Sequence, residues 1–156
     1  MERPQKIKNQ IFLVLFALVA VVILLDFVLP GHEHIEQIDS VRKTRQQTYN
    51  AARNFHYSYG LKTENFYFPV SEKFATTIEE KQSVRFRVSR IFNKVNTYES
   101  LESRESGMYS LRLVSGLILP ILVLIILTVN YKGRKFGVFT LIIKILLLFD
   151  LVYLLY

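Results

Sequence analysis

The sequence contains no cysteine, which excludes disulfides, thiolate metal sites and a cysteine nucleophile. It contains no Asn-x-Ser/Thr sequon, so nothing points to glycosylation on a eukaryotic secretory route. A glycine-rich phosphate loop and a nucleophile elbow are also missing, and the soluble part has no paired carboxylates with acid–base spacing. These absences predict that the chain is not an enzyme and that it binds no cofactor.

About half of the residues (51%) are hydrophobic, and they gather in three blocks with the charge between them. This segregation is typical of an integral membrane protein. The net charge of +7 would also suit a nucleic-acid partner, but the position of the charge argues against one. The basic residues that flank the apolar blocks are Arg3, Lys6, Lys8, Lys132, Arg134 and Lys135. We therefore expect membrane lipid, and no nucleic acid, as a partner.

The three apolar blocks predict transmembrane helices over residues 11–29, 113–129 and 136–156. A helix rises 1.5 Å per residue, so the first block spans roughly 28 Å, about the thickness of the hydrocarbon core. A cleaved signal peptide is the alternative for this block, but no small-x-small cleavage site follows it. In the second block, Pro120 should kink the helix, and Ser115 and Gly116 should permit close helix packing.

The basic clusters fix the expected orientation, because positive charge accumulates on the cytoplasmic side. Residues 1–10 and the tight loop 130–135 are then cytoplasmic, whereas residues 30–112 and the C-terminus lie outside. The lack of cysteine does not decide the compartment. We expect a bacterial inner membrane.

Residues 30–112 should form a small extracytoplasmic β-rich domain, either a sandwich or a barrel, with one short helix. Alternating apolar and polar residues predict strands that include residues 55–59 and 84–88. A short aromatic strand is expected over residues 66–70, and Ser71 should cap a helix that ends near Ile78.

The remaining segments of this domain are predicted with alternatives. Residues 33–53 suit a strand, although Ile35, Ile38 and Val41 also fit a helix. Residues 91–98 are expected to continue or re-pair the strand over 84–88. Residues 99–107 should form a loop, and residues 108–112 a last strand that leads into the second span.

Four polar residues stand in or beside the predicted spans: Asp26, Arg112, Lys144 and Asp150. A lysine near the bilayer centre costs at least ~2.5 kcal/mol, so Lys144 should face a protein interface or a hydrated path. Asp26 and Asp150 lie at nearly the same depth by helical rise. We expect these residues, with Arg112 as a further cation, to form a polar cluster that ties the three helices together. The alternative for Asp26 is a position near water at the helix end.

The predicted ectodomain offers weaker candidates for chemistry. His32 and His34, with Glu36 and Asp39 nearby, could hold a divalent metal, because alternate residues of an extended segment share a face. A linker beside the membrane is the alternative. Ser71, Lys73 and Lys81 raise the question of a Ser/Lys hydrolase. A serine at a strand-to-helix turn of a membrane-tethered β domain is similar to the arrangement in signal peptidases. Lys81-Gln82-Ser83 stands where that family has Gly-Asp, and nothing orients a lysine towards Ser71.

A basic run is predicted beside the buried aromatic residues of the ectodomain. It could contact anionic headgroups or an acidic partner, or form the solvated face of an edge strand. Its members are Arg85, Arg87, Arg90 and Lys94.

Together these features predict a non-catalytic accessory, assembly or scaffold subunit of a membrane complex. Its partner would be another membrane or extracytoplasmic protein, docked through the ectodomain and the transmembrane helices. Two alternatives remain. One is a small transport or ion-translocating component that uses Lys144, Asp26 and Asp150. The other is a membrane-tethered hydrolase or metal-binding protein.

Overall fold

The structure is a computed structural model that describes residues 3–47, 55–131 and 137–156. The chain divides into two compact units. One comprises residues 1–30 and 111–156 and holds the long apolar helices; the other comprises residues 31–110 and holds the β-sheet. The predicted fold class, three membrane-spanning helices with a small β-rich domain, is confirmed.

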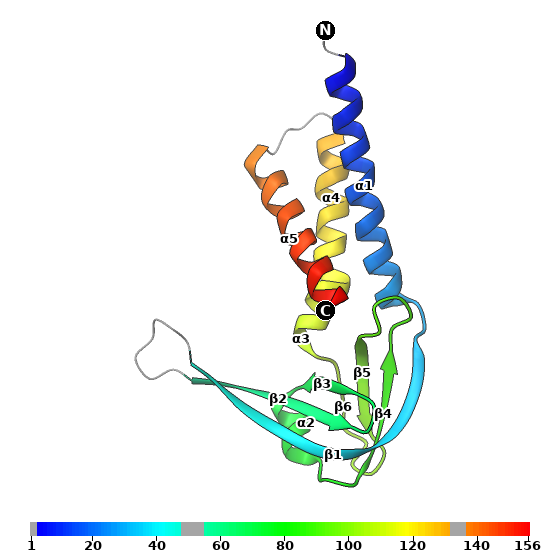
Figure 1. The fold of residues 1–156 in the computed structure, drawn as a ribbon, viewed down its shortest axis with the longest axis vertical. Helices are drawn as coiled ribbons and strands as arrows, with labels where there is room; N and C mark the ends of the chain where they lie inside the picture. The colour runs from blue at the N-terminus through cyan, green and yellow to red at the C-terminus, as the bar shows by residue number, and fades with distance from the viewer. Residues whose placement is uncertain (1–2, 48–54, 132–136) are drawn as a thin grey trace. The chain divides into compact units, whose positions relative to one another are not determined.

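The helical unit contains three candidate spans, Gln10–Val28, Ser110–Tyr131 and Gly137–Leu155. The first lies within α1 (Arg3–Val28), and the third is α5 (Gly137–Leu155). The second consists of α3 (Ser110–Leu113), η1 (Val114–Ile118) and α4 (Leu119–Tyr131). Helix α4 packs against both α1 and α5 (Figure 1). Most apolar side chains of the spans point outward, as expected for helices that face lipid.

The second span changes its helical geometry just before Pro120. Over η1 the hydrogen bonds follow π-helical spacing, and the Leu119 N–H donates to the Val114 carbonyl. This widened turn precedes the proline, which has no N–H to donate. Gly116 lies in the same turn and faces the Phe27 ring so closely that a Cβ atom would overlap it. A small residue is therefore needed here for α1 to approach η1, as the sequence predicted.

The other unit is a curved, six-stranded antiparallel sheet with the order β3-β2-β1-β4-β5-β6, which forms half of a barrel (Figure 1). The strands are β1 (His32–Gln47), β2 (Phe55–Thr63), β3 (Tyr67–Val70), β4 (Ser83–Val88), β5 (Val95–Ser100) and β6 (Ser106–Gly107). Strand β1 pairs with β4 over its first part and with β2 over its second, and the register shifts between Ile38 and Ser40. This long strand therefore joins the two halves of the sheet.

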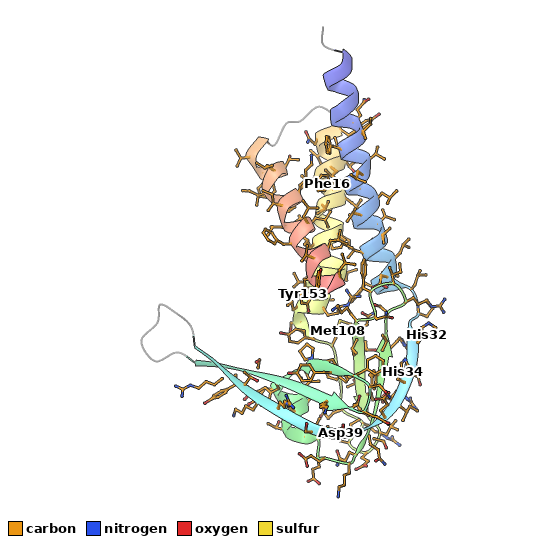
Figure 2. The ribbon with its side chains drawn as sticks, in the orientation of Figure 1. Phe16, His32, His34, Asp39, Met108 and Tyr153 are labelled. Atoms are coloured by element: carbon orange, nitrogen blue, oxygen red, sulfur yellow. The ribbon has the colours of Figure 1, made fainter. Side chains whose placement is uncertain are left out.

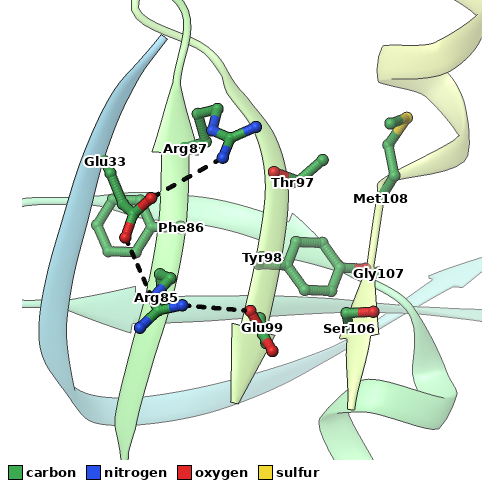
Figure 3. A pocket seen from close by; sticks show the side chains of 10 residues that line it. All are labelled: Glu33, Arg85, Phe86, Arg87, Thr97, Tyr98, Glu99, Ser106, Gly107 and Met108. Carbon is green, nitrogen blue, oxygen red and sulfur yellow. Dashed lines mark ion pairs between the residues drawn. The ribbon is translucent and has the colours of Figure 1, made fainter. Parts of the chain in front are cut away.

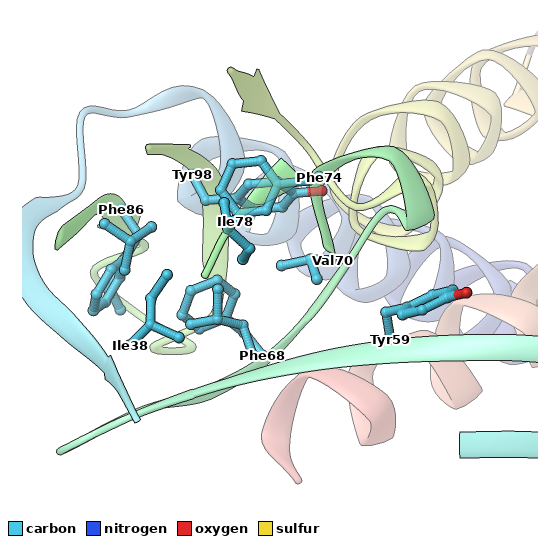
Figure 4. Close-up of a cluster of buried hydrophobic side chains, with 11 residues drawn as sticks. Ile38, Tyr59, Phe68, Val70, Phe74, Ile78, Phe86 and Tyr98 are labelled. Carbon is cyan, nitrogen blue, oxygen red and sulfur yellow. The ribbon is translucent and has the colours of Figure 1, made fainter. Parts of the chain in front are cut away.

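One short helix, α2 (Glu72–Thr77), packs against β2, and its Phe74 side chain joins the buried core cluster (Figure 4). Ser71 caps it as predicted, because the Ser71 hydroxyl accepts a hydrogen bond from the Phe74 N–H at 3.3 Å. The core gathers apolar side chains from the helix and five strands. It comprises Ile38, Tyr59, Leu61, Phe68, Val70, Phe74, Ile78, Val84, Phe86, Val88 and Tyr98.

For residues 91–98 the second alternative is confirmed, because a turn reverses the chain and β5 pairs back with β4. Three other local predictions were wrong, wholly or in part. Residues 108–112 do not form a strand, because β6 ends at Gly107 and a helix begins at Ser110. Strand β4 is not at an edge of the sheet, since β1 and β5 pair with its two sides. Residues 99–107 include the end of β5 and all of β6, so they are not wholly a loop.

Candidate functional site

An ion pair is buried in the helical unit between Asp26 of α1 and Arg112 of α3. One guanidinium nitrogen of Arg112 lies 2.9 Å from the Asp26 carboxylate. The Asp26 side chain is 0% exposed and the Arg112 side chain 3% exposed. The guanidinium also lies 5.4 Å from the centre of the Phe27 ring. A buried charge is tolerated when it is paired, so this contact allows both residues to sit inside the helical unit.

Asp150 of α5 adds a second carboxylate to this ion pair. The side chain is buried, and it interacts electrostatically with Arg112. Its Oδ2 atom has no hydrogen-bond partner among the described residues. The structure thus brings Asp26, Arg112 and Asp150 together from all three spans, with Arg112 as the cation between two carboxylates.

Lys144 of α5 has different neighbours from the other three polar residues. Its ammonium lies 5.3 Å from the centre of the Phe16 ring, and within the described residues it forms no ion pair. It lines a groove of about 560 Å³ in the helical unit. Thr140, one turn before Lys144, lines the same groove; its hydroxyl is buried and has no hydrogen-bond partner in the part of the chain that is described. The remaining lining residues are Phe12, Leu13, Phe16, Asn130, Gly137 and Leu141. Figure 2 labels Phe16 on α1.

The basic run of the ectodomain is partly neutralised by acidic neighbours (Figure 3). Arg85 lies 3.2 Å from Glu33 and 3.8 Å from Glu99, and Arg87 lies 3.8 Å from Glu33. The 3.2 Å contact is ionic, because the Arg85 Nε atom has no partner with hydrogen-bond geometry. These side chains line a pocket of about 390 Å³.

The other two members of the basic run lie beyond the end of β4. Arg90 is exposed, and Lys94 is half-buried, with its backbone N–H bonded to the Ser89 hydroxyl at 3.1 Å. The four cations therefore do not form one continuous surface free of acidic groups.

The two candidate metal ligands, His32 and His34, lie on β1. The His34 ring packs between Phe66 and Phe86, with centroid distances of 5.0 and 5.5 Å, whereas His32 is exposed. The described residues contain no group of three or more His, Asp or Glu side chains that could hold a metal.

The acidic residues near these histidines do not gather around them. Asp39 is exposed, and Glu36 accepts hydrogen bonds at 3.3 and 3.1 Å from the backbone and side-chain amides of Asn65. Partial burial acts to raise the pKa of Glu36, but hydrogen bonds from Thr63 and Asn65 outweigh it and lower that pKa. Glu36 thus fixes the loop at Asn65 as a carboxylate.

The residues considered for a hydrolase have structural partners. The Ser71 hydroxyl caps α2, and the Lys73 ammonium lies 3.1 Å from the Glu105 carboxylate. Lys81 has a positive φ of 73° in the turn before β4. Its N–H donates to the Ile38 carbonyl at 2.8 Å.

Sequence reasoning missed a basic arm, formed by residues 40–45 of β1 and residues 57–62 of β2. A signal for it exists in the sequence, since residues 40–63 contain five Lys or Arg and no Asp or Glu. On one face, the Lys43 ammonium lies 4.1 Å from the centre of the Tyr57 ring and 5.4 Å from that of Tyr59. A hydrogen bond with Tyr59 raises the pKa of Lys43, so this group stays charged at neutral pH.

The chain thus presents a buried charge cluster, a groove with an isolated lysine and a basic arm. A comparison with known proteins finds no family model, no curated protein and no solved structure that matches this chain.

Proposed function

We propose that this protein is a non-catalytic accessory or assembly subunit of a membrane complex. In this proposal it resides in a bacterial inner membrane with its N-terminus in the cytoplasm and its sheet outside. The observation that carries the proposal is the groove that contains Lys144 and Thr140. Both residues offer polar groups for which the described part of this chain provides no ion-pair or hydrogen-bond partner.

The energetic argument starts from Lys144. Lys144 is the seventh residue after Gly137, the first residue of α5, which places it about 10 Å along the helix axis. A charged group at that depth is costly in the hydrocarbon core of a membrane. The Phe16 ring offsets part of that cost through a cation–π contact. A carboxylate from a partner helix would neutralise the charge and recover more of the cost.

Thr140 supports the same conclusion from a second atom. A buried hydroxyl without a partner is destabilising, and Thr140 can donate to a group placed in the groove. The groove is otherwise lined mainly by apolar side chains, among them Phe12 and Leu141. An apolar helix that carries one Asp or Glu fits this combination of charge, hydroxyl and apolar surface.

The test is a native mass spectrum of the protein extracted gently from its own membrane. We expect a defined heteromer that contains a second membrane protein with an intramembrane Asp or Glu. Lys144→Met removes the charge and keeps an unbranched side chain of similar length, and it should dissociate the partner. Ile145→Met, on the lipid-exposed neighbour, should leave the complex intact.

Other outcomes would change the assignment. A monomer would contradict the proposal. A homo-oligomer whose assembly requires Lys144 would favour the alternative hypothesis of a transport or ion-translocating component. In that hypothesis Lys144, Asp26 and Asp150 line the path of the transported ion or solute. A heteromer that survives Lys144→Met would retain the accessory function but place the docking surface elsewhere.

A further inference from the structure

The outer end of the basic arm extends beyond the rest of the sheet as a two-stranded ribbon, whereas its inner part is also paired with β3. Strand β3 pairs only with Tyr59–Lys62 of β2, and β4 pairs only with His32–Gln37 of β1. The segment in which Thr44 pairs with Ser58 and Arg45 with Tyr57 therefore has no third strand among the described residues (Figure 1). An isolated two-stranded ribbon is marginally stable in water, so contact with another surface would stabilise this end of the arm.

Cations lie on both faces of the arm. Residues opposite each other in an antiparallel pair share a face, so Lys43 and Arg45 lie with Tyr59 and Tyr57. Arg42 and Lys62 lie on the other face, opposite Gly60 and Ser40. Tyr59 is buried and belongs to the core of the sheet unit. The side chains of Arg42, Lys43, Arg45, Tyr57 and Lys62 are exposed.

The arm contains no acidic residue of its own to neutralise these cations. The acid that reaches it is Glu72 of α2, whose carboxylate accepts a hydrogen bond from the Tyr59 hydroxyl at 2.8 Å. Arg42 and Lys62 form no ion pair within the part of the chain that the structure describes. The arm therefore keeps a surplus of positive charge at its surface.

We propose that the basic arm binds the surface of an anionic phospholipid bilayer through the phosphate groups of the lipids. Lysine and arginine are attracted to such surfaces, and tyrosine is favoured at the boundary between headgroups and acyl chains. Tyr57 is 41% exposed and lies beside Lys43, so the arm presents both kinds of side chain together.

A bilayer suits the arm better than an acidic protein does, for two reasons. First, the chain is anchored in a membrane, and the segment that connects α1 to the arm comprises only residues 29–39. Fully extended, this segment spans at most roughly 40 Å. Headgroups are therefore always at high local concentration. Second, cations spread over both faces of the arm match a diffuse layer of phosphates, whereas protein interfaces tend to be depleted in lysine.

The experiment compares the full chain in two kinds of nanodisc. One contains phosphatidylcholine alone, and the other contains equal parts phosphatidylcholine and phosphatidylglycerol. Hydrogen exchange is followed in peptides that cover residues 38–45 and 57–63. One basic residue near an anionic membrane surface contributes about 1 kcal/mol, which corresponds to roughly a fivefold change in an equilibrium constant. We therefore expect exchange of the arm to be at least about fivefold slower in the anionic nanodiscs. This difference should disappear at high salt.

Two triple variants separate the arm from overall charge. Arg42→Gln, Lys43→Gln and Arg45→Gln together should abolish the difference between the two nanodiscs. Lys73→Gln, Arg90→Gln and Arg104→Gln change the net charge equally at exposed positions elsewhere on the sheet unit and should preserve it. Exchange in β4 and β5 checks that each variant remains folded.

Three results would overturn the proposal. The first is equal exchange of the arm in the two nanodiscs. The second is equal loss of protection in both triple variants, which would indicate a general charge effect. The third is protection by soluble polyglutamate in phosphatidylcholine nanodiscs together with none from phosphatidylglycerol, which would assign the arm to an acidic protein instead.

Discussion

Asp26 and Arg112 form a buried ion pair at 2.9 Å although 86 positions of sequence separate them. Residues 31–110, which fold as a separate unit, lie between the two helices that carry the pair. The pair therefore joins the end of the first span to the beginning of the second. Asp150 of the third span also interacts electrostatically with Arg112. Arg112 is therefore the residue on which the cluster depends.

We predict that Arg112→Met destabilises the helical unit more than Asp26→Asn does. Removing the cation leaves two buried carboxylates without their counter-ion, whereas Asp26→Asn leaves Arg112 with Asp150. Breaking a buried pair costs about 3–5 kcal/mol in soluble proteins. Thermal unfolding in a mild detergent provides the measurement. The double variant Asp26→Leu and Arg112→Met should cost less than the sum of its two single changes, and additive effects would contradict the pairing.

The sequence predicted the spans well because membrane helices leave a strong and local signal. Long apolar blocks and flanking basic residues are sufficient to locate α1, α4 and α5. The alternation of Val84, Phe86 and Val88 likewise identified the buried face of β4. Such patterns report which residues are buried, and they do not report which strands pair.

The intramembrane cluster was only partly predictable, because the depth of a residue along a helix does not give the face of the helix on which its side chain lies. Lys144 and Asp150 are six residues apart, so at about 100° per residue they lie on faces roughly 120° apart. This angle, together with about 9 Å of helical rise, separates Lys144 from the cluster. Arg112 was expected in the cluster with Asp26, but their direct pairing could not be derived from the sequence, since it depends on how α1 packs against η1 at Gly116.

Gly116→Ala should destabilise the helical unit by about 1–3 kcal/mol, the usual cost of overpacking. The added methyl group would overlap the Phe27 ring, whose neighbour Asp26 belongs to the buried ion pair. Thermal unfolding in detergent again provides the measurement. A second substitution, Phe27→Ala, should make Gly116→Ala nearly harmless. If Gly116→Ala costs the same in both backgrounds, the steric explanation is wrong.

Tyr98→Phe should destabilise the sheet unit by about 1–2 kcal/mol. The Tyr98 hydroxyl accepts a hydrogen bond from the Ser71 N–H at 2.9 Å, and without it this amide loses its partner at the start of α2. Hydrogen exchange of α2 in the full-length protein should accelerate accordingly. Tyr57→Phe, which alters an exposed ring outside the core, is the control and should leave α2 unchanged.

Stability of the sheet unit should fall in acid through Glu36. Because its pKa is lowered in the folded state, Glu36 stabilises the fold at pH values above its ordinary pKa near 4.5. That contribution is lost as the pH falls through the lower, folded-state pKa. Since Glu36 lies at the surface and is only partly buried, solvent screens these interactions, and we expect an effect of no more than about 1 kcal/mol.

The measurement is denaturant unfolding of the full chain, followed through the exchange of β1 and β2 peptides between about pH 6 and pH 3. Glu36→Gln keeps an oxygen that can accept hydrogen bonds from Asn65 but does not titrate in this range. It should lower stability at pH 6 and flatten the pH dependence. Glu64→Gln, at the exposed neighbour of Asn65, makes the same change in charge and should leave the slope as it is in the wild type. If Glu36→Gln leaves the pH dependence of stability unchanged, the explanation is wrong. The hydrogen bonds from Asn65 and Thr63 would then not favour the charged carboxylate over the neutral carboxyl group.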